Sequence, residues 1–102
     1  MNRDVVFDLI SRIGMATDED GNQESTLTKR TVYGKEESIG QKEYFSAAAT
    51  GLKPEKKITV FFGDYADERE AEVCGRVLDI YRTHFRDADE RMELYMSEKA
   101  GS

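Results

Sequence analysis

The stretch "EYFSAAATGLKPEKKITVFF", from Glu43 to Phe62, predicts a helix in its first half and a strand in its second. The alanine-rich residues up to Thr50 favour a short helix, and Gly51 can end that helix by adopting a positive φ. From Lys56 onward, β-branched and aromatic residues alternate in the way that favours a strand. Nearly all of the remaining chain also predicts strands. The short helix is therefore an exception whose role has to be explained separately.

The predicted helix has little support from its own sequence. Ser38 can serve as its N-cap, or Gly40 can do so more weakly. Tyr44, Ala47 and Ala48 are spaced so that they share one apolar side. A helix of about ten residues is not stable alone in water, so we expect it to pack on another surface.

The chain predicts a mainly β fold, a small antiparallel β-barrel or sandwich of about six strands with one short helix between the second and third strands. The first segment fits a strand or a short helix about equally by periodicity, and its β-branched residues favour the strand. Gly34 in the second strand is a candidate for a β-bulge. The expected strands are Val5–Ile13, Leu27–Ile39, Lys56–Phe62, Glu70–Val73, Arg76–Phe85 and Arg91–Met96.

Alternation within these strands separates the expected core from the expected surface. Thr59 and Phe61 should point to the outer face, and so should Glu93 and Tyr95. The residues expected to line the core are Leu9, Ile58, Val60, Phe62, Leu78, Ile80, Leu94 and Met96.

Length and composition restrict the class of protein. The 102 residues predict one domain, residues 1–102, and the hydrophobic content of 38% suggests a thin core or apolar surface shared with a partner. A formal charge of −6 argues against binding to a phosphate backbone, which needs clustered Lys and Arg. With one cysteine and no run of membrane-spanning length, we expect a soluble protein, made in a reducing cytoplasm and without a membrane partner.

No residue pattern in the sequence predicts catalysis, a cofactor or a metal site. Cys74 and His84 are the candidate nucleophile and base, and along an extended strand they would lie about 30 Å apart. The acidic loop Thr17–Thr26 resembles a calcium loop, but Ala16 and Leu27 would occupy two of the ligand positions. We therefore expect a protein that is not an enzyme.

A small β-barrel that binds nucleic acid, or a general protein-interaction module, is the alternative. Five Tyr and five Phe could form a stacking platform for single-stranded nucleic acid. The acidic balance opposes this, and the basic residues are interleaved with Glu instead of forming a stripe.

An ordered set of short motifs resembles the phage head–tail joining family, the head-closure or stopper proteins of long-tailed bacteriophages. The matching stretches are Glu43–Glu55 ("EYFSAAATGLKPE"), Asp64–Glu68, Gly75–Thr83 ("GRVLDIYRT") and Glu93–Tyr95 ("ELY"), within a likeness that extends from Val5 to Met96. Each motif alone is weak, and the order and spacing carry the resemblance. Leu78 and the pair His84-Phe85 depart from the family pattern.

The resemblance implies a structural protein of the virion, from an active phage or a prophage. Such proteins form a homo-oligomeric ring at the head–tail interface, close the portal channel after DNA packaging and dock the tail. The implied partners are a portal adaptor protein and a tail-terminator or tail protein, and assembly takes place in the cytoplasm of the host bacterium. A small β-barrel with a short helix and a long loop is the implied fold.

The segment Ser38–Lys57 holds the longest piece of the chain that is not committed to a strand, and it supplies the candidate interface with other subunits or with the channel. In a ring it could project inward or across subunit boundaries, and its lysines could make non-specific contact with packaged DNA. A surface loop without a role remains the alternative. The candidate interface residues are Tyr44, Phe45, Ala48, Gly51, Leu52, Lys53, Lys56 and Lys57.

Overall fold

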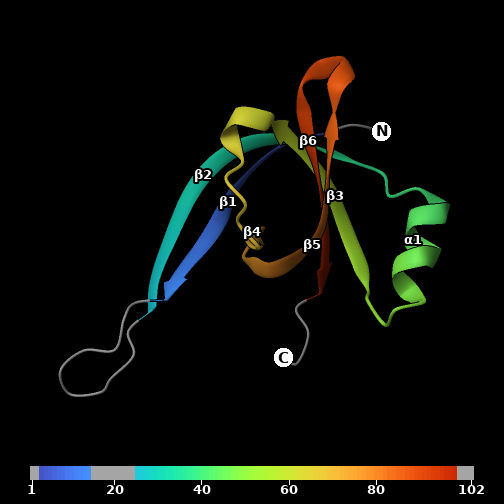
Figure 1. The fold of residues 1–102 in the computed structure, drawn as a ribbon, viewed down its shortest axis with the longest axis horizontal. Coiled ribbons are helices and arrows are strands. Elements are labelled where there is room, and N and C mark those ends of the chain that lie inside the picture. The colour runs from blue at the N-terminus through green and yellow to red at the C-terminus, as the bar shows by residue number, and fades with distance from the viewer. Residues whose placement is uncertain (1–2, 15–24, 99–102) are drawn as a thin grey trace.

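Every predicted strand forms in the computed structural model, which describes residues 3–14 and 25–98. The strands are all antiparallel and close into a barrel in the order β1-β2-β3-β6-β5-β4, so the mainly β prediction is confirmed and the barrel replaces the sandwich (Figure 1). The elements are β1 (Arg3–Gly14), β2 (Ser25–Glu37), α1 (Gln41–Ala48), β3 (Pro54–Phe61), the 3-10 turn η1 (Phe62–Asp64), β4 (Glu70–Val73), β5 (Arg76–Arg86), the 3-10 turn η2 (Asp87–Asp89) and β6 (Arg91–Glu98). The acidic loop predicted at Thr17–Thr26 lies largely outside the described residues.

Strands β1 and β2 pair without interruption from Arg3 opposite Glu36 to Gly14 opposite Ser25. The bulge predicted at Gly34 is therefore wrong. Gly34 is needed for a different reason: a Cβ there would lie 2.7 Å from the carbonyl oxygen of Thr59 and 2.8 Å from Cγ2 of Ile58. The glycine lets β2 approach β3 closely.

The barrel interior holds most of the predicted core. Leu9, Ile58, Val60, Leu78, Leu94 and Met96 are buried as expected, and Ile80 is half-buried against them. Phe7, Val32, Ala71 and Val73 complete the buried cluster.

Phe62 does not belong to the core, so its prediction is wrong. Its side chain is 46% exposed because β3 ends at Phe61 and the chain turns into η1. There the Phe62 N–H donates to the carbonyl oxygen of Glu90 in the turn between β5 and β6. The rings of Phe61, Phe62 and Phe85 meet as a small exposed aromatic cluster, with ring centres 5.2 and 5.6 Å apart.

Strand β5 contains the irregularity that positions the candidate site. Its register with β6 shifts between Ile80, opposite Met96, and Arg82, opposite Tyr95, so Tyr81 is an extra residue. Such a bulge interrupts the alternation of side chains and redirects them. A tight turn at Cys74-Gly75 connects β4 to β5, as predicted.

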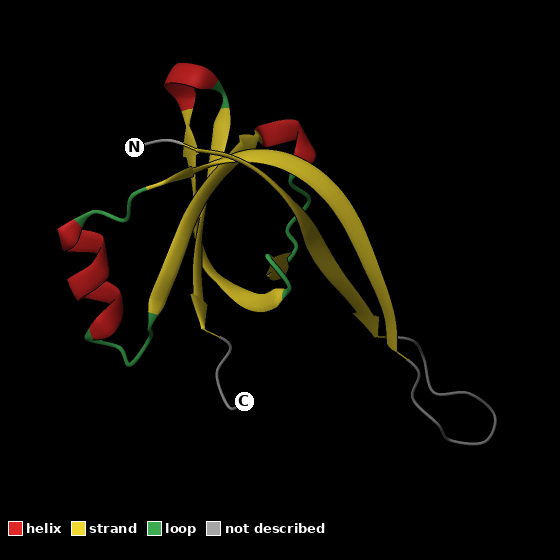
Figure 2. Cartoon of the chain, turned by 180° about the vertical axis from the view of Figure 1, so that it is seen from behind, coloured by secondary structure: helices red, strands yellow, loops and turns green. Residues whose placement is uncertain are grey.

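Helix α1 lies between β2 and β3 in sequence, as predicted, and beside the barrel in space. Its N-cap is Gly40, which is one of the two predicted alternatives, and Gly51 follows it with a φ of 88°. Figures 1 and 2 show α1 on the opposite side of the barrel from the far end of the β1–β2 hairpin. The strand predicted from Lys56 begins two residues earlier, at Pro54, so the segment outside the strands is shorter than expected.

Candidate functional site

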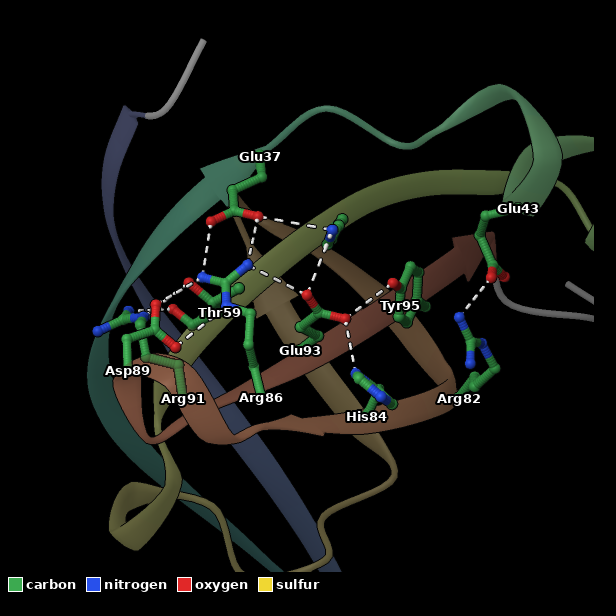
Figure 3. A network of polar contacts seen from close by, with 11 residues as sticks. Glu37, Glu43, Thr59, Arg82, His84, Arg86, Asp89, Arg91, Glu93 and Tyr95 are labelled. Atoms are coloured by element: carbon green, nitrogen blue, oxygen red, sulfur yellow. Dashed lines mark hydrogen bonds and ion pairs between the residues drawn. The ribbon is translucent and has the colours of Figure 1, made fainter.

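The outer face of β3, β5 and β6 carries a polar network centred on Glu93 (Figure 3). One Glu93 oxygen accepts from the Tyr95 hydroxyl at 3.0 Å and lies 3.2 Å from Nδ1 of His84. The other lies 3.1 Å from Nη1 of Arg86 and 3.5 Å from Nζ of Lys57. Glu93 and Tyr95 point outward as predicted, but both are buried beneath their neighbours instead of exposed.

Arg86 connects this network to β2 and to the β5–β6 turn. It donates to both Glu37 oxygens, at 3.3 and 3.2 Å, and to both Asp89 oxygens, at 3.0 and 2.9 Å. The hydrogen bonds from Arg86 hold the pKa of Glu37 below its usual value. Burial raises the pKa of Glu93, but its hydrogen bond from Tyr95 and the charge of Lys57 outweigh burial and lower it. These carboxylates are ionised partners of cations, which suits a rigid surface better than proton transfer near neutral pH.

Thr59, which was also predicted to point outward, is fully buried and is covered by Arg91. The Arg91 guanidinium donates to the Thr59 hydroxyl at 2.9 Å and to the Thr59 carbonyl oxygen at 2.6 Å. The outer face is thus sealed by long side chains that hydrogen-bond across strands.

Helix α1 is attached to this face mainly through Glu43. Its carboxylate accepts from the Tyr81 hydroxyl at 3.1 Å and from Nη2 of Arg82 at 2.5 Å. Both partners reach Glu43 because the β5 bulge places them side by side on this face. Burial raises the pKa of Tyr81, and the hydrogen bond to Glu43 raises it further. The Arg82 guanidinium also lies over the ring of Tyr95, 4.3 Å from its centre.

Apolar packing adds little to this attachment. Ala47 is the buried residue of α1, and the N-cap Gly40 makes no side-chain hydrogen bond. An open groove separates the helix from the barrel, lined by Lys42, Glu43 and Ala47 on the helix side and by Lys57, Arg82 and Tyr95 on the barrel side. The helix is therefore held at the barrel surface rather than packed into it.

The predicted interface residues fall into two groups, the first of which lies in α1 and the turn that follows it. Tyr44 and Phe45 are exposed, with their rings edge to face and their centres 6.0 Å apart. Ala48 and Gly51 are also exposed, while Leu52 is half-buried and its N–H donates to Ala47. Of Tyr44, Ala47 and Ala48, predicted to share one apolar side of the helix, Ala47 is buried and the other two are exposed.

The second group, the three lysines, follows the helix in sequence, and two of them belong to β3. Lys53 is exposed and pairs with Glu98 at 3.7 Å. Lys56 and Lys57 belong to β3, where Lys56 pairs with Glu36 at 3.2 Å and Lys57 joins the Glu93 network. Lys53 is thus the most accessible of the three for contact with DNA.

Sequence reasoning missed the residues that hold the helix. Nothing in the sequence singles out Tyr81 or Arg82, because the bulge that brings them together leaves no clear signal in it. Glu43 was recognised as part of a helix, and the distant pair that binds it became visible only in the fold.

Several further observations bear on function. Cys74 is an exposed thiol in the β4–β5 turn, while His84 lies in the Glu93 network. Within residues 3–14 and 25–98, no three His, Cys, Asp or Glu side chains gather in a way that could hold a metal ion. In the same part of the chain, no helix has the length and apolar character needed to cross a bilayer.

No family model, curated protein or solved structure matches the chain.

Proposed function

We propose that the protein is a ring-forming component of a phage head–tail connector, which closes the portal channel after DNA packaging and docks the tail. The motifs that resemble the head–tail joining family support this proposal, and so does the agreement between the fold that they imply and the six-stranded barrel. The proposed partners are a portal adaptor and a tail-terminator or tail protein, and the proposed location is the head–tail interface of the virion.

The observation that carries the proposal is the position of α1. A ring subunit must present an element outside its own core to its neighbours or to the channel. Helix α1 stands outside the barrel, exposes Tyr44 and Phe45, and is held mainly by Glu43. Exposed aromatic side chains on an otherwise polar surface are typical of protein interfaces.

The cations of the outer face favour a role in assembly over nucleic-acid binding. Lys57, Arg82 and Arg86 each pair with carboxylates of the same chain, so they offer little free charge to a phosphate backbone. Contact with packaged DNA is accordingly a minor part of the proposal, with Lys53 as its best-placed residue.

Deleting the gene from the phage that carries it tests this function. We expect electron microscopy to show heads separate from tails, together with loss of infectious particles and of DNA retained in heads. A plasmid copy of the wild type should restore infectivity. If the deletion phage yields complete, infectious particles, the proposed function is wrong.

The same assay can test the role of α1. The double variant Tyr44→Ser with Phe45→Ser should fold but fail to restore infectivity, because it removes the exposed aromatic pair. The matched control is Gln41→Ser with Lys42→Ser, which changes exposed polar residues of the same helix and should complement normally. Equal complementation by both would remove α1 from the proposed interface.

A further inference from the structure

Strand β2 has a free edge along much of its length. One side of β2 pairs with β1 throughout, whereas the other side pairs with β3 only from Gly34 to Glu37. Among the residues that the structure describes, no backbone group pairs with residues 28–33 from that second side. An unpaired edge presents a row of N–H and C=O groups, which is a template for another strand.

The sequence does little to protect this edge. Natural edge strands are blunted by proline, bulges or inward charges. Residues 28–33 contain no proline and keep an unbroken register with β1, and Arg30, which lies opposite the core residue Leu9, is their one charge on the inward face. Lys29 and Arg30 are charged, yet each pairs with its own chain, with Glu72 at 3.0 Å and Glu68 at 2.6 Å. Tyr33, which is 76% exposed, adds an aromatic side chain suited to cross-strand packing.

Strand β5 has a second free edge. Its β4 side is paired from Arg76 to Asp79, and the Ile80 N–H then donates to the carbonyl oxygen of Arg69. Beyond that point, residues 82–86 pair with β6 on one side and with no described residue on the other. An open hollow lined partly by Tyr65, Arg69 and Thr83 lies beside the start of this edge, so the edge is accessible.

We infer that these two edges pair with each other between copies of the chain, residues 28–33 of one copy against residues 82–86 of the next. The occupant is a second copy because the same chain carries both edges, they are similar in length, and backbone pairing requires an extended strand. The edges belong to different strands, so the contact is head-to-tail and repeats from copy to copy. Such a contact closes into a ring when the rotation between copies allows it. This inference rests on the proposed function, for which it supplies the contact between subunits.

Electrostatics permit this pairing. The Arg and Lys side chains of the two edge segments are already paired within the chain, since Arg82 pairs with Glu43 and Arg86 pairs with Glu37 and Asp89. Joining the edges therefore brings together no uncompensated like charges, which would destabilise directly opposed strands.

Two edge variants and their mixture test the inference. The β2-edge variant carries Thr28→Lys with Tyr33→Lys, and the β5-edge variant carries Thr83→Lys with Phe85→Lys. Added lysines on an edge block strand addition, and all four positions are exposed. Circular dichroism checks folding, and Thr83→Lys alone replaces the second variant if that variant unfolds.

In sedimentation equilibrium up to about 1 mM, we expect the wild type to associate with rising concentration while each variant alone stays monomeric. An equimolar mixture of the variants should form a dimer and nothing larger, because it retains one intact edge of each kind. Hydrogen exchange in the wild-type assembly should slow at residues 28–33 and 82–86, which a contact made only by side chains would not cause.

Three results would overturn the inference. The first is a wild type that stays monomeric up to about 1 mM. The second is an equimolar mixture of the two variants that forms no dimer. A variant that associates alone as the wild type does would indicate pairing of like edges or another surface. The mixing experiment and the gene deletion are independent. If the deletion phage stays infectious while the mixture forms a dimer, the proposed function is wrong and the edge contact still holds.

Discussion

Removing the Glu43 carboxylate should loosen α1 without opening the barrel. Glu43→Ala deletes both hydrogen bonds that attach the helix, and Glu43→Gln keeps the shape of the side chain but removes its charge. Because Ala47 is the buried residue of α1, little apolar packing remains to hold the helix.

The size of the effect follows from the exposure of the two bonds. The Arg82 side chain is 46% exposed and that of Glu43 is 17% exposed, so the pair resembles a surface salt bridge of about 0.2–1 kcal/mol. The hydrogen bond from Tyr81 adds about 0.5–1.5 kcal/mol. A combined loss of about 1.4 kcal/mol corresponds to about ten-fold faster exchange of amides that open with the helix.

Hydrogen exchange resolved by peptide measures this directly. We expect amides of α1 to exchange about ten-fold faster in Glu43→Ala and less than that in Glu43→Gln, while amides of β3 and β6 remain well protected. The matched control is Glu98→Gln, which breaks the exposed Lys53–Glu98 pair beside the same segment and should leave α1 unchanged.

Unchanged exchange of α1 in Glu43→Ala would refute the reasoning, because the helix would then be held by something other than its carboxylate. If Glu98→Gln speeds amide exchange in α1 as much as Glu43→Ala does, the attachment through Glu43 is also contradicted. Any lost charge near the segment would then have the same effect.

Three further predictions concern the stability of the barrel. Leu78→Ala should lower the free energy of unfolding by about 2–5 kcal/mol in denaturant titration, and Ile80→Ala should cost less because Ile80 is only half-buried. Gly34→Ala should cost about 1–3 kcal/mol in the same titration, since its Cβ would meet backbone at 2.7 Å, and a neutral result would contradict the close approach of β2 and β3. Glu37 has a pKa lowered by Arg86, so it stabilises the fold above its ordinary value of 4.5 and loses this contribution as the pH falls through its folded-state pKa. Thermal melts from pH 6 to pH 3 should therefore show a shallower acid loss of stability in Glu37→Gln than in the wild type.

Local pattern was enough to place the elements of this fold. The strands, the helix between the second and third of them, and the turn at Cys74-Gly75 all follow from periodicity and from residues suited to positive φ. Alternation also identified most of the buried residues, because side chains in a strand point to opposite faces whatever lies beside it. It failed at Phe62, where the strand ended one residue earlier than its sequence suggested.

The construction of the outer face depends on contacts between strands that are not evident from the sequence. Glu93, Tyr95 and Thr59 read as exposed, but they are buried because Arg86, Lys57 and Arg91 from neighbouring strands cover them.

The bulge at Tyr81 depends likewise on strand register. The hydrogen bonds from Tyr81 and Arg82 to Glu43 join residues that are far apart in sequence. The identity of the strands, the position of the helix and the apolar faces of the strands could all be predicted from the sequence. Which polar side chains meet across that surface is decided by the pairing of the strands, because β3 pairs with β2 and β6, and β6 pairs with β5, so these four strands lie side by side.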